Sequence, residues 1–191
     1  MRTSCDPALN PFLNAEEKHL FVRKRRTPMR DGMGIRLLGL VLSIAPISAT
    51  ALGLSCSAST TGVAFGNYSP INLLPASAAG NVRVFCTVAL VSVNAQINIS
   101  LSPGGSGSFS PRSLSSGANQ LPYNLYSDAP TTIVWGDGTS GTGNVTHNLP
   151  IAVLGTTVNS PVYGKIPAAQ YVPAGSYTDT ITVTVEYHEA L

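Results

Sequence analysis

The chain has 191 residues and a formal net charge of +2, and only 10% of its residues are charged. Eight of its eleven basic residues come before position 37, and the rest of the chain carries three basic and five acidic residues, a net charge of −2. A chain of this length can bury the core of one ordinary domain. The lack of a basic face after position 37 excludes a nucleic-acid-binding domain, so no nucleic-acid partner is expected.

The N-terminal part has the pattern of a secretory signal peptide. A basic segment is followed by the apolar residues 37–44 and then by Ala49 and Ala51, which predicts cleavage before Leu52. The apolar run is short and is interrupted by Pro46, which disfavours a permanent membrane span. The sequence therefore predicts export.

This signal divides the chain into two parts. We interpret residues 1–51 as an N-terminal extension plus signal peptide, and residues 52–191 as the mature domain. Signal peptides rarely have so long a polar preface, so we expect the natural translation start at Met29 or Met33.

Two cysteines, Cys56 and Cys86, remain after the leader is removed. An oxidising compartment favours a disulfide between them, and two free buried thiols are the alternative. Closing a loop of this length stabilises a fold by about 3–4 kcal/mol in the chain-entropy account. Cys5 lies in the predicted extension and is assigned no role.

The mature part predicts an all-β fold. Residues 177–187 alternate between a mainly apolar face, which includes Ile181, Val183, Val185 and Tyr187, and a face of threonines, as expected for a strand lying on a core. Shorter strands are predicted at residues 82–88, 96–101, 121–126, 131–135, 149–154 and 162–166. The spacing leaves no room for crossover helices, which favours a β-sandwich with exposed loops at residues 102–110 and 136–143.

No catalytic or metal site is predicted. Residues 136–141 match the glycine pattern of nucleotide-binding loops, but no helix follows, so we interpret them as a turn. His147 and His188 are the two histidines of the mature part and are interpreted as exposed surface residues, and two isolated histidines are a weak case for a metal site. Asp128 and Asp137 leave a glycosidase open as a remote alternative.

Trp135, the single tryptophan, follows Ile133 and Val134 at a predicted strand end and is expected in the core.

Several segments together resemble one known family. The segments are Val63-Ala64-Phe65-Gly66-Asn67-Tyr68 after Cys56, the Cys86 strand, residues 97–101 with Pro103-Gly104, Arg112, Tyr123-Asn124-Leu125-Tyr126 with Asp128, Trp135-Gly136-Asp137-Gly138, Tyr163-Gly164-Lys165-Ile166-Pro167 and Pro173-Ala174-Gly175-Ser176-Tyr177-Thr178-Asp179. In order and spacing this series resembles the spore coat protein U domain, shared with subunits of archaic, Csu-type chaperone-usher pili.

The resemblance implies an immunoglobulin-like β-sandwich that lacks its last strand. In that family a periplasmic chaperone lends a strand, and an outer-membrane usher then exchanges it for the N-terminal segment of a neighbouring subunit. The resemblance assigns Ile181, Val183, Val185 and Tyr187 to the interface with the chaperone or donor strand, and it matches Cys56 and Cys86 to the family's disulfide. The core motif is carried over to Phe65, Tyr123, Trp135, Tyr163 and Tyr177.

One departure concerns the segment before the first mature cysteine. Only residues 52–55 lie between the predicted cleavage site and Cys56, and they are too few for an average strand. Either cleavage occurs near Ala45 and leaves residues 46–55 as a weak donor, or the subunit accepts a strand and donates none.

The predicted function is that of a structural subunit of a bacterial surface fibre or coat, which supports adhesion and biofilm formation. The alternative is a tip-located adhesin or glycan-binding module whose loops contact a surface. An enzyme is not predicted, and neither is a small-molecule cofactor. The resemblance further implies transit through the periplasm to the cell surface.

Overall fold

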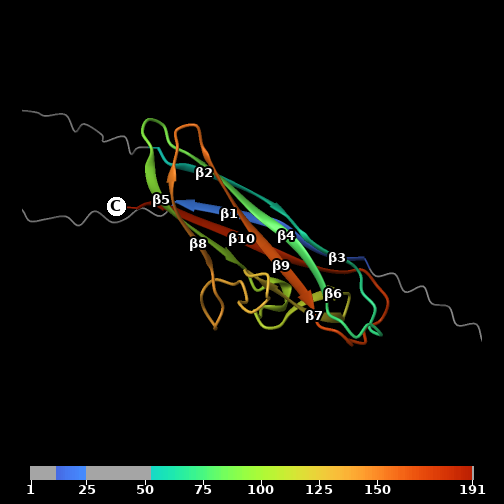
Figure 1. Ribbon diagram of the computed structural model, residues 1–191. Coiled ribbons are helices and arrows are strands. Elements are labelled where there is room, and N and C mark those ends of the chain that lie inside the picture. The colour runs from blue at the N-terminus through green and yellow to red at the C-terminus, as the bar shows by residue number, and fades with distance from the viewer. Residues whose placement is uncertain (1–11, 25–52, 191) are drawn as a thin grey trace, which may run out of the picture.

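The computed structural model describes residues 12–24 and 53–190, and strands dominate these residues (Figure 1). The elements are β1 (Phe12–Lys24), β2 (Ser55–Thr61), β3 (Val63–Asn67), β4 (Ala76–Thr87), β5 (Val93–Leu101), the 3₁₀ turn η1 (Gly104–Ser106), β6 (Arg112–Ser116), β7 (Asn119–Tyr126), β8 (Val145–Ile151), β9 (Thr156–Ile166) and β10 (Tyr177–Glu189). Across the described part of the chain, no helix has the length and apolar character needed to cross a membrane. The predicted leader features at residues 37–51, Met29 and Met33 lie outside the described residues.

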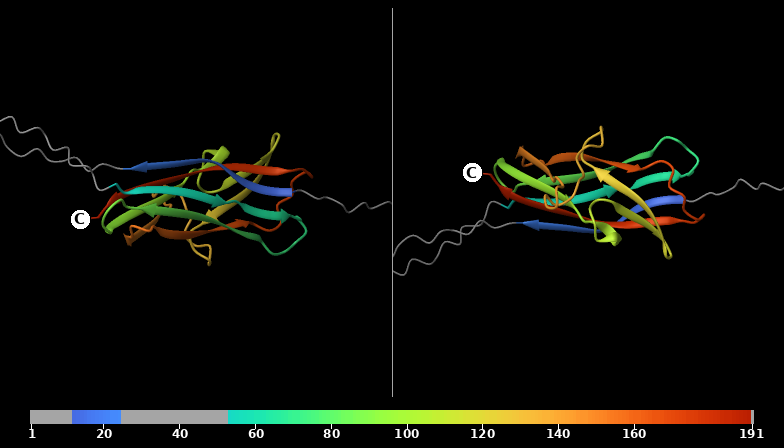
Figure 2. Two further views of the ribbon diagram at one scale, coloured as in Figure 1. Left: turned by 90° about the horizontal axis from the view of Figure 1, so that it is seen from above. Right: turned by 90° about the horizontal axis from the view of Figure 1, so that it is seen from below.

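The strands form the two layers of a sandwich, seen edge-on in Figure 2. One sheet has the order β2-β4-β9-β7, and the other has the order β3-β1-β10-β5-β8. Strand β6 pairs with both β7 and β10 and so links the two sheets. Two sheets in this order, around one shared core, match the immunoglobulin arrangement. The predicted all-β immunoglobulin-like sandwich is confirmed.

Strand β10 has the predicted alternation of buried and solvent-facing residues. Its inner positions from Tyr177 to Tyr187 are all buried, whereas the threonines between them are exposed or half-buried. One edge of β10 pairs antiparallel with β5, from Val183 with Leu101 to Glu189 with Ala95. The pairing makes β10 the central strand of its sheet.

The second edge of β10 faces the position that the final strand has in an immunoglobulin fold. β10 is the last strand along the chain, and this position is filled by β1, from the N-terminal extension. β1 runs parallel to β10 and antiparallel to β3, whereas immunoglobulin sheets are antiparallel throughout. Residues 53–190 thus lack their own last strand, as predicted.

Two expectations about this position differ from the structure. We expected another polypeptide to fill it, but residues 12–24 of the same chain do so. We also expected the folded body to begin at residue 52, with no part for the extension. The extension contains a 13-residue stretch that can pair as a strand, and the two unpaired edges of β3 and β10 favour any strand within reach. Removal of residues 1–51 as a leader stays a prediction.

Several predicted boundaries also differ. Residues 131–135 form isolated bridges instead of a strand, because the Asp128 carboxylate accepts hydrogen bonds from the backbone of Thr132 and Ile133 and holds a loop. The strand predicted at residues 149–154 ends at Ile151, where a turn follows with Gly155 N–H donating to the Ala152 carbonyl. Strands β2, β3 and β6 were not predicted individually.

Glycine at position 164 allows the two sheets to approach each other. Gly164 faces inward from β9, and a Cβ atom there would lie 2.5 Å from Val63 Cγ1 and 2.6 Å from Phe65 Cζ. Any larger residue would push β3 away from the core. The family segment Tyr163-Gly164-Lys165 therefore has a packing reason for its glycine.

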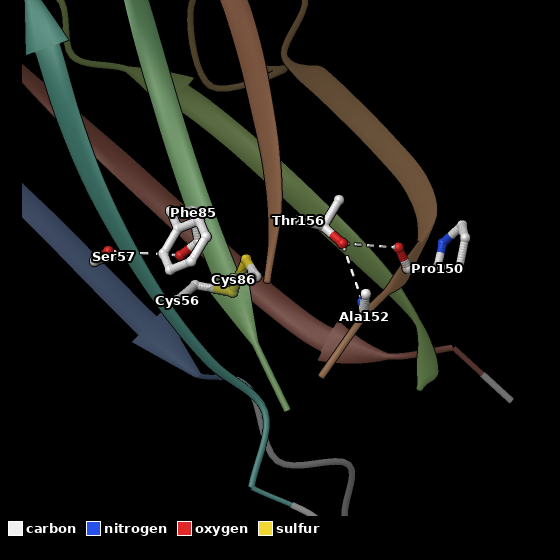
Figure 3. The surroundings of a disulfide bond; sticks show 7 residues. All are labelled: Cys56, Ser57, Phe85, Cys86, Pro150, Ala152 and Thr156. Atoms are coloured by element: carbon white, nitrogen blue, oxygen red, sulfur yellow. Dashed lines mark hydrogen bonds between the residues drawn. A yellow bond between two sulfur atoms is a disulfide. The ribbon is translucent and has the colours of Figure 1, made fainter. Parts of the chain in front are cut away.

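A disulfide joins Cys56 of β2 to Cys86 of β4, as predicted (Figure 3). The two residues stand directly opposite each other in the antiparallel pairing of these strands, and both are buried. Beside them the Ser57 hydroxyl donates to the Phe85 carbonyl. The bond closes a loop of 30 residues that includes β3 and the connection from β3 to β4.

We expect the disulfide to stabilise the fold by about 3–4 kcal/mol, because it restricts the unfolded chain. Replacing both Cys56 and Cys86 by alanine should lower the free energy of unfolding by about that amount in denaturant titrations. The titrations should be made in a Cys5→Ser background, which removes the third thiol. Equal stability of the two proteins would contradict this account, as would an unchanged periplasmic yield of Cys56→Ser.

Candidate strand-acceptor site

The candidate site is the strand position between β10 and β3, which we call the acceptor groove. On the β10 side, Leu20, Val22 and Lys24 pair in register with Val183, Val185 and Tyr187. Those three β10 residues are at most 7% exposed and belong to the core. A strand in the groove therefore lies next to core residues of β10. The register shifts between Glu16 and His19, so that Ile181 has no in-register partner in β1.

The β3 side supplies a shorter edge. Phe12 pairs with Asn67, Leu13 with Gly66, and Ala15 with Val63, after which β3 ends while β1 continues along β10. β10 therefore provides most of the pairing surface of the groove. The predicted interface residues Ile181, Val183, Val185 and Tyr187 all lie on this strand, and their role with a partner stays a prediction.

The floor of the groove is a chain of contacts across the sandwich. Phe65 of β3 packs edge-on against Tyr123 of β7, with ring centroids 5.9 Å apart at 80°. The Tyr123 hydroxyl donates a 2.7 Å hydrogen bond to Asp179 Oδ2 of β10. Asp179 Oδ1 accepts from the backbone N–H of Gly105 and Thr180, so that both carboxylate oxygens are bonded. These contacts tie the two flanks of the groove to the facing sheet.

A fully buried arginine lies in the same polar cluster. Arg112 of β6 donates to the Ser102 carbonyl, to Asn124 Oδ1 at 2.8 Å and to the Trp135 carbonyl at 2.7 Å. Burial lowers the pKa of Arg112, and the neighbouring Tyr123 and Asp179 oppose this effect. A buried charge without such partners would cost several kcal/mol. Arg112 thereby holds together the loop after β5, strand β7 and the Trp135 segment.

Most residues of the predicted core motif are buried in the structure. Trp135, Tyr123 and Tyr177 are at most 1% exposed, and Phe65 is 9% exposed. Trp135 Nε1 donates to the Ile99 carbonyl. Tyr163 is the exception, because the alternation of β9 turns Val162 and Gly164 inward and leaves Tyr163 half-buried on the outer face.

The interpretation of His147 as an exposed loop residue is wrong. His147 lies in β8 and pairs with the fully buried Ile97, which places it at an inward-facing position. Its Nε2 is 2.8 Å from the hydroxyl of Ser160, a buried residue of β9. Burial lowers the pKa of His147. The pair joins the two sheets at their edge, while His188 is half-buried near the end of β10.

The carboxylates of Asp128 and Asp137 are used within their own loops. Asp128 accepts hydrogen bonds from Thr132 and Ile133, and Asp137 accepts from Thr139. Hydrogen bonding lowers the pKa of both groups, whereas a glycosidase needs one carboxyl with a raised pKa. In the described residues no group of three or more His, Cys, Asp or Glu side chains could hold a metal ion. These two residues therefore do not support the glycosidase alternative.

The family model of the Spore Coat Protein U domain matches residues 44–184 of this chain. The chain belongs to the Spore Coat Protein U domain family. The matched region contains the disulfide, the core motif and most of β10, and it excludes β1. The region that defines the family is thus the body of the sandwich without the strand that fills the acceptor groove.

Two individual proteins are similar to the chain. Protein U of Myxococcus xanthus is 34% identical over 132 residues, which cover 64% of this chain and 70% of Protein U. One solved structure is the CsuC-CsuE chaperone-tip adhesion subunit pre-assembly complex from the archaic chaperone-usher Csu pili of Acinetobacter baumannii, with 22% identity and a TM-score of 0.42. That match covers 70% of this chain but only 40% of the other, and so low a TM-score does not establish a shared fold.

Sequence reasoning missed three features of the site. It did not identify the bonds of Arg112, the Tyr123–Asp179 contact or the His147–Ser160 pair. Charged residues are few in this domain, so Arg112 and Asp179 in apolar or hydroxyl-rich strands were a usable sign of a buried polar cluster. The position of His147 within an alternating segment was the corresponding sign for the histidine.

We expect Tyr123→Phe to lower the free energy of unfolding by about 1–3 kcal/mol, because it leaves a buried Asp179 oxygen without its hydrogen-bond donor. Tyr171→Phe is a matched control, since Tyr171 is 80% exposed. Denaturant titration of the two variants measures the difference. Equal effects of both substitutions would exclude a stabilising role for the Tyr123–Asp179 bond.

We expect the stability of the protein to fall as the pH is lowered below about 6.5, the ordinary pKa of histidine. The pKa of His147 is lowered in the folded state, so between its two pKa values the unfolded chain binds more protons than the folded one. His147→Gln should flatten the dependence of the denaturation midpoint on pH between about 7 and 5. Most carboxylates titrate below this range and so contribute little to the slope within it. His188→Gln is the control, and a slope unchanged in His147→Gln would refute the assignment.

Proposed function

We propose that the chain is a structural subunit of a secreted bacterial surface fibre or coat, assembled by strand exchange. The observation that supports the proposal is the acceptor groove, a position that the family-matched region leaves open between β3 and β10. An unfilled groove would leave the backbone groups of both edges unpaired and the apolar core open to water. A strand from a partner would satisfy both requirements at once.

In this proposal β1 holds the place that a partner strand takes during assembly. The partners are a periplasmic chaperone, an outer-membrane usher and neighbouring subunits, and β10 presents Ile181, Val183, Val185 and Tyr187 to them. The basic and apolar leader directs the chain to the periplasm. The mature subunit lacks β1, because leader removal separates β1 from the body or, with a translation start at Met29 or Met33, β1 is never made. The product at the cell surface supports adhesion and biofilm formation, and its activity is assembly, not catalysis.

The start of β2 bears on whether the subunit also donates a strand. Leu54 is only 3% exposed, and Ser55 already pairs with Thr87. Residues from 54 onward therefore belong to the subunit's own sandwich. Cleavage before Leu52 would then leave only residues 52 and 53 for donation, whereas cleavage near Ala45 would leave residues 46–53. A start at Leu52 favours an acceptor at the end of a fibre, and with it the tip-located adhesin as the second candidate function.

The loops first considered for adhesion lie beside each other. Leu101 N–H donates to the Gly136 carbonyl at 3.0 Å, which joins the start of the 102–110 loop to the start of the 136–143 loop. Each loop is also held by a further hydrogen bond. Arg112 donates to the Ser102 carbonyl of the first loop, and in the second loop Thr139 N–H donates to Asp137 Oδ1. In the adhesin alternative this pair of loops is the surface that contacts a glycan or another ligand.

The test compares three exported chains without a chaperone. The first is the natural chain, the second carries a copy of residues 12–24 after Leu191 on a flexible linker, and the third carries that copy with aspartate in place of Leu20 and Val22. We expect the first and third to be degraded or to aggregate and the second to accumulate as a monomer. N-terminal sequencing then identifies the leader cleavage site.

A natural chain that accumulates alone as a soluble monomer, with its N-terminus at Leu52, would refute the strand-acceptor function. A second arm adds a cognate chaperone to the natural chain. Rescue by the chaperone in the same yield as by the appended strand is the expected result.

A further inference from the structure

The loop between β3 and β4 exposes several large apolar side chains at one end of the acceptor groove. Ile71, Leu73 and Leu74 are 78%, 90% and 78% exposed. Single exposed apolar residues are ordinary on protein surfaces, but a cluster of three within four positions is typical of an interaction site. The opposite end of β4 carries a separate apolar cluster, and it serves below as a control.

The exposed loop surrounds a hollow of about 660 Å³, which we call the mouth pocket. It is lined by residues 67–69 and 71–76. Asn67 is the first of these residues and also the β3 residue that pairs with Phe12, the first residue of β1. Figure 2 shows that β1 begins at the end of the sandwich where this loop lies. A polypeptide that continues beyond the groove at this end therefore meets the mouth pocket.

The base of the mouth pocket is anchored. Tyr68 is 4% exposed, its hydroxyl donates to the Pro167 carbonyl at 3.0 Å, and it accepts from Gln170 N–H at 2.9 Å. Asn72 N–H donates to the Ser69 carbonyl within the loop. A pocket held in this way is formed before a ligand arrives, which reduces the entropy lost on binding.

The chemistry of the pocket selects an uncharged apolar ligand. No charged residue occurs between Ala64 and Val82, or between Pro167 and Ser176 in the neighbouring loop. The residues that line the pocket therefore offer no ion pair, and burial of leucine and isoleucine side chains is the main source of binding free energy.

We infer that the mouth pocket extends the acceptor groove and binds apolar residues that flank the strand placed there by a neighbouring subunit. For a strand that runs like β1, the flank is N-terminal to the paired residues, and for a strand of opposite direction it is C-terminal. The inference rests on the proposed function. It adds a second determinant of partner choice. Two donor strands that pair equally well with β10 can still differ in the residues that flank them, and the mouth pocket would distinguish them.

The test uses the full chain with a protease site inserted between residues 24 and 53. The protein folds with β1 in place, the protease cuts the connection, and labelled peptides then exchange with the released β1. One peptide is residues 12–24 preceded by Leu-Ala-Leu-Pro, and the other has Ser-Ala-Ser-Pro in its place. We expect the apolar flank to slow peptide dissociation by about tenfold, as burial of leucine side chains predicts.

Two double variants locate the effect. Leu73→Ser with Leu74→Ser should remove the advantage of the apolar flank. Leu90→Ser with Leu154→Ser should leave it unchanged, because these leucines, 75% and 95% exposed, lie in loops at the other end of the sandwich. All four residues are exposed, so the folded state tolerates the changes.

Each outcome has a distinct meaning. Exchange of both peptides with equal dissociation rates would overturn the mouth pocket and leave the strand-acceptor function supported. An advantage that persists in the Leu73/Leu74 variant would also overturn it, since the flank would then bind elsewhere. Failure of both peptides to exchange would overturn the proposed function, and the inference with it.

Discussion

Backbone hydrogen bonding along the second edge of β10 is the constraint on which the rest of the structure depends. β10 is the central strand of its sheet, and its inner residues from Tyr177 to Tyr187 form much of the core. A central strand needs partners on both sides, and within residues 53–190 no strand pairs with this edge of β10. In the described residues the N-terminal extension supplies the missing partner, and a strand from another chain would meet the same requirement.

The buried polar cluster beneath the groove complements this constraint. Asp179, Tyr123 and Arg112 belong to three different strands, and each has its hydrogen-bonding groups turned toward the interior. Apolar contacts alone tolerate sliding of one sheet over the other, whereas a network of directed bonds fixes one register. The groove therefore has a defined floor and defined flanks, which a strand-binding site requires.

Sequence reasoning recovered the fold because the alternation in residues 177–187 and the lack of helical periodicity are strong local signals. It also recovered the Cys56–Cys86 disulfide and the burial of Trp135. It placed His147 on the surface and Tyr163 in the core because the side of a strand that faces inward depends on register, which sequence spacing near a strand end does not fix. It missed β1 because residues before a predicted leader were assumed to play no part in the fold, and pairing over such a sequence separation has no local signature.

The disulfide also determines how the domain would carry mechanical load. In a fibre, tension that reaches the subunit through its N-terminal side enters β2 at Ser55 and meets the bond to β4 one residue later. β2 cannot be peeled from the sheet beyond Cys56, because the force passes covalently into β4, which pairs with β9 from Ala76 to Cys86 and with β2 from Asn81 to Thr87. Pulling would then act on the hydrogen bonds of β4 together, in shear, instead of opening those of β2 one after another.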